Sequence, residues 1–71
     1  MNETGRLLEF ISFCIEMYAE RGSISGRDAM ERFTRFGVVD YLERNYEALH
    51  TQGFGWILPA IDDYIAAQEG A

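Results

Sequence analysis

Lysine is absent from this chain of 71 residues, and cysteine, histidine, tryptophan and proline each occur once. Without lysine there is no side-chain amine for Schiff-base chemistry. The lone cysteine, Cys14, can neither close an internal disulfide nor supply a metal cluster, so we expect a reducing, cytoplasmic setting. Metal binding through His50 would need two or three more ligands from acids scattered along the chain. The residues present therefore predict no metal and no cofactor.

Long apolar runs and an excess of positive charge are missing as well. The most apolar stretch, Leu7 to Ala19, is interrupted by Glu9 and Glu16. A membrane-spanning helix needs about 20 apolar residues, so we expect neither a membrane segment nor a signal peptide. Six arginines and twelve acidic residues give a net charge of −6, which disfavours nucleic acids and anionic membranes as partners. Residues 21–36 hold four of the arginines, between two acidic segments.

The groups that nucleophilic catalysis requires are not arranged in a usable pattern. A nucleophile needs a neighbouring base, usually oriented by a third group. Cys14 falls on the apolar face of a predicted helix, where a thiol normally behaves as an inert hydrophobic group. Asp62 and Asp63 are adjacent, so on a helix their side chains diverge by about 100° and cannot share one proton or one metal ion. We therefore expect that the protein is not an enzyme.

What the sequence does contain is typical of an all-α domain. Hydrophobic residues make up 48% of the chain, and they recur at helical spacing in four segments, while no segment alternates as a strand would. We expect a single domain over residues 1–71, folded as a compact bundle of four short helices at about 4–21, 26–36, 38–51 and 57–68. The predicted inward positions are Leu7, Ile11, Cys14 and Tyr18; Ala29, Met30, Phe33 and Phe36; Val38, Val39, Leu42, Tyr46 and Leu49; and Ile57, Ile61, Tyr64 and Ile65.

The first predicted helix has more apolar surface than one face can hold. The residues that widen its apolar stripe on both sides are Leu8, Phe10, Ile15 and Met17. We expect this helix either to be the most buried element or to contact something outside its own domain.

Capping residues mark the ends of the helices. Ser25 is a typical N-cap, with Asp28 in the position of a capping-box acid, and Gly22 and Gly37 are natural stops. Pro59 is tolerated in the first turn of the last helix, because the amides there have no intrahelical partner.

The stretch ALHTQGFGW, residues 48–56, holds the single histidine and the single tryptophan. We interpret it as a turn between two helices, in which His50 hydrogen-bonds to free carbonyls at a helix end and Gly53 adopts a left-handed conformation. Thr51 and Gln52 would cover free backbone groups, and Phe54 and Trp56 would return to the core. A binding role for this turn stays open, because exposed loops often carry function.

The second and third predicted helices have the lengths of a helix-turn-helix, with Gly37 at the turn. The exposed residues of the third helix would face the phosphates of the DNA groove, and they are Asp40, Glu43, Arg44 and Glu47. Because their net charge is negative, a nucleic-acid binder is the less favoured interpretation.

Four segments give the chain a distinctive pattern: FISFCIEMYAE, SISGRDAMERF, GVVDYLERNYEALHTQG and AIDDYIA. In these segments the chain resembles a family of short bacterial proteins of unknown function, most common in gut Firmicutes and Actinobacteria. The resemblance covers nearly all of residues 7–66 and is most specific in DYLERNYEALHTQG. The matching positions are Phe13, Cys14, Ile15, Glu16, Asp40, Tyr41, Tyr46, His50, Thr51, Gly53, Ile61, Asp62 and Tyr64. The chain differs from the family pattern in having no lysine.

The resemblance implies no catalytic residue, but it implies a genomic context. Such genes often lie beside genes for another small family, which itself resembles ADP-ribosyltransferases. An acidic helical protein suits the basic substrate cleft of such an enzyme. We therefore expect a small non-catalytic protein-interaction module that acts as the antitoxin-like or regulatory partner of a neighbouring ADP-ribosyltransferase-like protein.

Aromatic residues dominate the energetics of protein interfaces, so they are the natural anchors for a partner. The candidate partner-binding residues are Tyr18, Tyr41, Tyr46, His50 and Trp56. The alternative is a self-sufficient homodimer, in which the surplus apolar face of the first helix is buried against a second copy.

Overall fold

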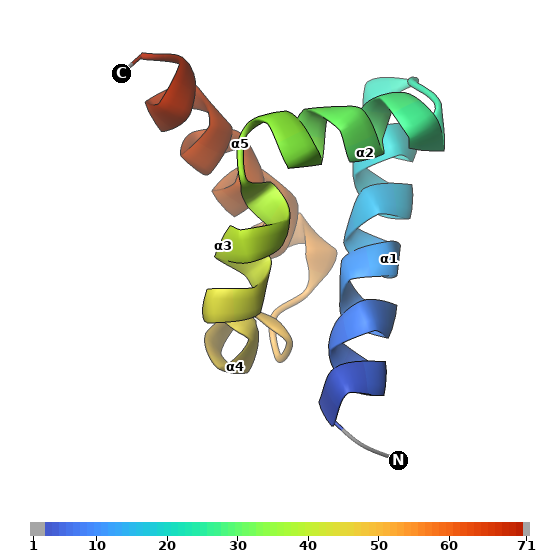
Figure 1. The fold of residues 1–71 in the computed structure, drawn as a ribbon, viewed down its shortest axis with the longest axis vertical. Helices are drawn as coiled ribbons and strands as arrows, with labels where there is room; N and C mark the ends of the chain where they lie inside the picture. The colour runs from blue at the N-terminus through green and yellow to red at the C-terminus, as the bar shows by residue number, and fades with distance from the viewer. Residues whose placement is uncertain (1–2, 71) are drawn as a thin grey trace.

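The computed structural model describes residues 3–70, in which the chain forms five helices joined by short turns (Figure 1). The helices are α1 (Glu3–Gly22), α2 (Gly26–Arg35), α3 (Val38–Arg44), α4 (Tyr46–Leu49) and α5 (Phe54–Glu69). No residue between 3 and 70 lies in a strand, so the predicted all-α bundle is confirmed.

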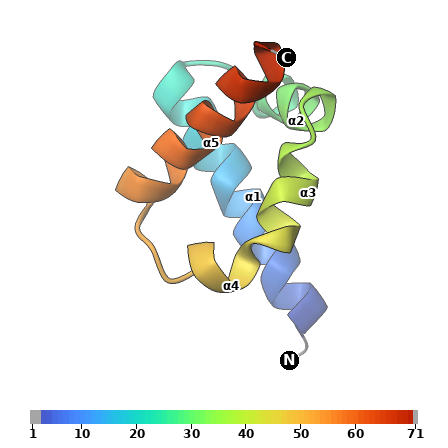
Figure 2. The same cartoon turned by 90° about the vertical axis from the view of Figure 1, so that its left-hand side faces the viewer.

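Helix α1 runs along most of the molecule and sets the positions of the others (Figures 1 and 2). The next helix, α2, crosses α1 at the C-terminal end of α1. Helices α3 and α4 then return toward the N-terminal end of α1. The last helix, α5, packs against α1 and α3 and ends near α2. As a result α4 and the turn that follows it lie beside the N-terminal half of α1.

All five helices contribute to one hydrophobic core. The largest side chains that are completely buried are Phe33, Leu42, Ile57, Ile61, Val38 and Cys14. These are predicted inward positions, so the helical faces read from the apolar spacing are largely confirmed. Met30 is an exception, because 47% of its surface is exposed on the outer side of α2.

The predicted third helix, residues 38–51, is broken at Asn45 into α3 and α4. The backbone N–H and the side-chain Nδ2 of Asn45 both donate to the Tyr41 carbonyl, at 3.1 and 2.8 Å. The backbone bond is the regular i to i−4 bond of a helix, whereas the side-chain bond competes for the same carbonyl and favours the end of α3 at Asn45. The turn after Asn45 points Tyr46 toward α1.

The last helix begins at Phe54, three residues before the predicted start, because Gly53 accepts hydrogen bonds from the N–H groups of Trp56 and Ile57 at 2.9 and 3.0 Å. Gly53 is extended, with φ −78° and ψ 161°, so the expectation that it is left-handed is wrong. Pro59 is consequently inside the helix, beyond its first turn. Because proline has no backbone N–H, Pro59 cannot donate the i to i−4 hydrogen bond to the Gly55 carbonyl, so the expectation that it lies in the first turn is wrong.

The turns around α2 agree with the capping signals. Ser25 Oγ accepts a hydrogen bond from the backbone N–H of Asp28 at 3.0 Å, as expected for an N-cap. Gly37, with φ +68°, supplies the left-handed residue between α2 and α3. Helix α1 ends at Gly22 as predicted, but Ser23 is the residue with a positive φ, at +55°. A serine in this conformation is strained, because its Cβ crowds the backbone.

Candidate functional site

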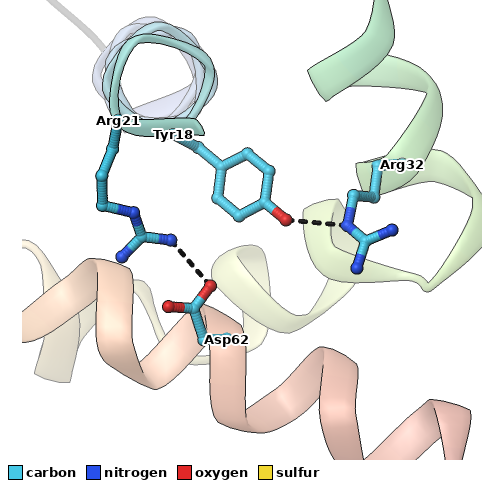
Figure 3. Close-up of polar contacts among 4 residues, drawn as sticks. All are labelled: Tyr18, Arg21, Arg32 and Asp62. Atoms are coloured by element: carbon cyan, nitrogen blue, oxygen red, sulfur yellow. Dashed lines mark hydrogen bonds and ion pairs between the residues drawn. The ribbon is translucent and has the colours of Figure 1, made fainter. Parts of the chain in front are cut away.

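Tyr18 is a structural residue at the C-terminal end of α1. It is 8% exposed, it packs edge to face on Phe33 at 5.1 Å between ring centres, and its hydroxyl accepts a hydrogen bond from Arg32 Nε at 2.8 Å (Figure 3). One turn further, Arg21 pairs with Asp62 of α5 at 2.7 Å. These contacts join three helices, and we call the four residues Tyr18, Arg21, Arg32 and Asp62 the polar clamp. Tyr18 is therefore buried in the protein's own core, as its predicted inward position implies, and its role as a partner-binding residue stays a prediction.

Tyr46 and His50 form a stacked pair beside the N-terminal half of α1. Their rings lie 4.5 Å apart at an angle of 13°, and Tyr46 also meets the ring of Phe10 edge to face at 5.3 Å. His50 Nδ1 lies 2.8 Å from the Tyr46 carbonyl, as expected for a histidine at a helix end. Because a carbonyl can only accept, Nδ1 carries the hydrogen in this contact. Nε2 makes no hydrogen bond within residues 3–70.

These rings line an open groove with a volume of about 470 Å³ between α1 and the segment from α4 to the start of α5. We call it the aromatic groove. Its lining residues are Arg6, Glu9, Phe10, Phe13, Tyr46, His50, Gln52, Phe54 and Ile57. Four of these nine residues are phenylalanine or tyrosine, and the polar ones supply an arginine, a carboxylate, an imidazole and an amide. Such a surface can bind an apolar group and orient it by a few polar contacts.

The other two candidate anchors lie away from the aromatic groove. Tyr41 is half-buried and stacks on Tyr64 at 4.3 Å, which joins α3 to α5. Trp56 is 58% exposed and lines a separate shallow hollow with Pro59 and Asp63, so it does not return to the core as expected. Phe54, by contrast, does pack against the core. The structure thus brings together two of the five candidate residues, Tyr46 and His50.

Phe13 is a groove residue that the apolar spacing of the first helix did not predict. It is 49% exposed and lies one turn after Phe10 and Glu9 on α1. Leu8, on another face of the same helix, is 61% exposed. The surplus of apolar residues on the first helix was the signal that pointed to this surface. With Leu8 and Phe13 this exposed, α1 is not buried on all sides.

A row of acidic residues runs along α1 next to Phe13. Glu9, Glu16 and Glu20 follow the i, i+7, i+11 spacing of one helix face, and all three are exposed. None of their carboxylates makes an ion pair or hydrogen bond within residues 3–70. We call these three residues the acidic row.

The single thiol and the possible metal-ligating side chains complete the description of residues 3–70. Cys14 is completely buried, and this burial raises the pKa of its thiol to about 12. No three histidine, cysteine, aspartate or glutamate side chains in residues 3–70 gather closely enough to hold a metal ion. None of the helices in that range combines the length and apolar character needed to cross a membrane.

Comparison with known proteins identifies a family but no characterised relative. No curated protein and no solved structure matches the chain. A family model described as a protein of unknown function, DUF3791, matches residues 9–68, which include all five helices in whole or in part. The match extends over the polar clamp and most of the aromatic groove. The chain therefore belongs to the DUF3791 family of proteins of unknown function.

Proposed function

We propose that this protein is a non-catalytic protein-interaction module that acts as the regulatory, antitoxin-like partner of a neighbouring ADP-ribosyltransferase-like protein. The aromatic groove is the observation that carries the proposal. It leaves Phe13 half exposed beside Phe10 and Tyr46, in a chain with few residues to spare for its own core. Aromatic side chains in such settings supply most of the binding energy of protein interfaces.

The chemistry of the chain supports binding rather than catalysis. The single thiol is buried, and the acidic pair Asp62 and Asp63 is divided, because Asp62 is engaged by Arg21. An acidic surface with an aromatic anchor suits a protein partner of opposite charge. The single cysteine has no partner for an internal disulfide, which supports the expectation of a reducing, cytoplasmic setting.

Co-expression with the protein encoded next to it tests the proposal. We expect a one-to-one complex to co-purify at moderate salt, with its mass measured by light scattering, and the partner's enzymatic activity to fall when the complex forms. Recovery of the chain alone, as a monomer or as a dimer of itself, would refute the proposed function. The dimer would then support the homodimer alternative.

A matched pair of variants separates the groove from the rest of the surface. Phe13→Ala and Met30→Ala each truncate a large apolar side chain that is about half exposed on a helix. If the groove is the interface, Phe13→Ala weakens the complex and Met30→Ala leaves it unchanged.

A further inference from the structure

The aromatic groove continues along α1 beyond the stacked rings. A second hollow of about 330 Å³ is lined by Met17, Glu20, Arg21, Phe54, Gly55 and Leu58. Phe54 borders both hollows, so they adjoin across its ring. Together they extend beside α1 from Arg6 to Arg21, a rise of about 22 Å along the helix axis. This is the length of about four turns of a partner helix.

The apolar residues that border the combined groove are spaced as a helix-binding surface requires. Phe10, Phe13 and Met17 follow one another at i, i+3 and i+7 on α1, and Phe54 and Leu58 face them from α5. An amphipathic helix binds such a groove by placing its own apolar residues at the same spacing against it.

The charge beside the groove specifies the chemistry of the partner. The acidic row, Glu9, Glu16 and Glu20, lies along one side of Phe13 and Met17 with no internal counter-charge. Arg21, the nearest cation at that end, is already paired with Asp62 at 2.7 Å. We propose that the groove binds a basic amphipathic helix of the partner, whose arginine or lysine residues pair with the acidic row.

A second copy of this chain is a poorer occupant on the same grounds. Two acidic rows would face each other across the contact, and each chain has a net charge of −6. Arg6 is the one unpaired cation that lines the groove within residues 3–70. Like charges opposed across an interface cost binding energy, whereas opposite charges favour association.

Fluorescence anisotropy with labelled helical peptides of about 18 residues tests this inference, which rests on the proposed function. The first set has leucine and phenylalanine at helical spacing with arginine on the flanks, and the second set replaces every arginine by glutamate. We expect the basic set to bind at least about tenfold more tightly, with affinity falling as salt rises. Equal affinities, or no binding by any basic peptide, would overturn the proposal.

Variants identify the surface that the peptide uses. Phe13→Ala is expected to weaken binding by about tenfold or more, since it removes the central aromatic anchor. The triple variant Glu9→Gln, Glu16→Gln and Glu20→Gln is expected to weaken binding and to flatten its salt dependence. Met30→Ala is the control and should bind as the unchanged protein does. Unaltered binding by both groove variants would contradict the proposal, and circular dichroism verifies that each variant is folded.

The variants, tested in the complex with the neighbouring protein, distinguish this inference from the proposed function. A one-to-one complex with the neighbouring protein that Phe13→Ala and the triple variant leave intact would preserve the interaction module and refute the basic helix as occupant. Light scattering that shows a dimer dependent on Phe13 would assign the groove to a second copy and overturn the proposal.

Discussion

The two halves of α1 use similar residues in different ways. In its C-terminal half, Tyr18 and Arg21 are held by partners on α2 and α5. In its N-terminal half, Phe10 touches Tyr46, but Phe13 is half exposed and Glu9 has no partner within residues 3–70. Tyr18 and Arg21 stabilise the fold, whereas Phe13 and Glu9 are available to another molecule. Aromatic side chains on the same helix therefore have opposite roles, depending on which helices cover them.

Phe33→Ala is the change that most severely disrupts the C-terminal half. Phe33 is completely buried and supports the ring of Tyr18. We expect the free energy of unfolding to fall by about 3–5 kcal/mol, which would unfold most of a domain of this size. Urea denaturation followed by circular dichroism measures this loss, with Met30→Ala as a control that changes stability by about 0.5 kcal/mol or less. A loss below about 1 kcal/mol would contradict the assigned packing.

Cys14 lies near the middle of α1, and its reactivity reports whether the core around it stays inaccessible to solvent. Because burial raises the pKa of the Cys14 thiol to about 12, the folded protein should hold almost no thiolate at pH 8. We expect modification by Ellman's reagent to be more than about a hundredfold slower than in urea. Rapid modification of the folded protein would show that the core opens readily.

The same shift in the pKa of Cys14 has a consequence for stability. A raised folded-state pKa means that stability is fully present below the unfolded value of about 9 and falls as pH rises from there toward 12. Urea titrations should show that the free energy of unfolding falls between pH 7.5 and pH 9.5. The fall should be smaller in Cys14→Ala, which lacks the thiol, whatever the stability of that variant at pH 7.5. Equal losses in the two proteins would contradict this contribution.

Two tyrosine-to-phenylalanine substitutions sharpen the comparison between the halves. Tyr18→Phe removes the acceptor of the Arg32 hydrogen bond and should cost about 1–2 kcal/mol of stability. The hydroxyl of Tyr46 makes no hydrogen bond within residues 3–70, so Tyr46→Phe should change stability by about 0.5 kcal/mol or less. Thermal denaturation of the two variants in parallel measures both effects. Equal losses would show that the polar clamp adds no stability beyond ordinary ring packing.

Ser23→Gly should produce a small, stabilising effect at the turn that follows the C-terminal half of α1. Glycine adopts the φ of +55° without the strain that serine bears, although it makes the unfolded chain more flexible. We expect a net gain of about 0.5–1 kcal/mol in thermal denaturation. Ser25→Ala, two residues away, removes the N-cap of α2 and should cost about 1 kcal/mol. A loss with Ser23→Gly would contradict the assigned strain.

Much of the fold could be predicted because helical spacing and capping residues are local properties. The first two predicted helices, the Ser25 cap and the stop at Gly37 follow directly from side-chain chemistry, and the structure confirms them. The break at Asn45 was not predictable from apolar spacing, because Leu42, Tyr46 and Leu49 keep a helical period across it. The early start of α5 depends on two hydrogen bonds to the Gly53 carbonyl, which the turn residues alone do not reveal.

The candidate site was predictable only in part, because the spacing of residues on one helix does not reveal which neighbour covers each face. Tyr46 and His50 lie four residues apart, so their stacking follows from their own segment. Tyr18 is buried because α2 brings Phe33 and Arg32 against it. This contact depends on the turn between α1 and α2, so the spacing on α1 alone does not predict it. Phe13 remains exposed because α4 and α5 stop short of covering it.

Hydrogen–deuterium exchange of the chain with and without its co-purified partner tests the central claim most directly, because it compares the residues of the aromatic groove with those around α2 in one experiment. The account predicts slower exchange on binding in residues 6–13 and 46–57, with little change in residues 24–35 around α2. Slower exchange confined to residues 24–35, with the aromatic groove unaffected, would contradict the assignment of the groove as the interface.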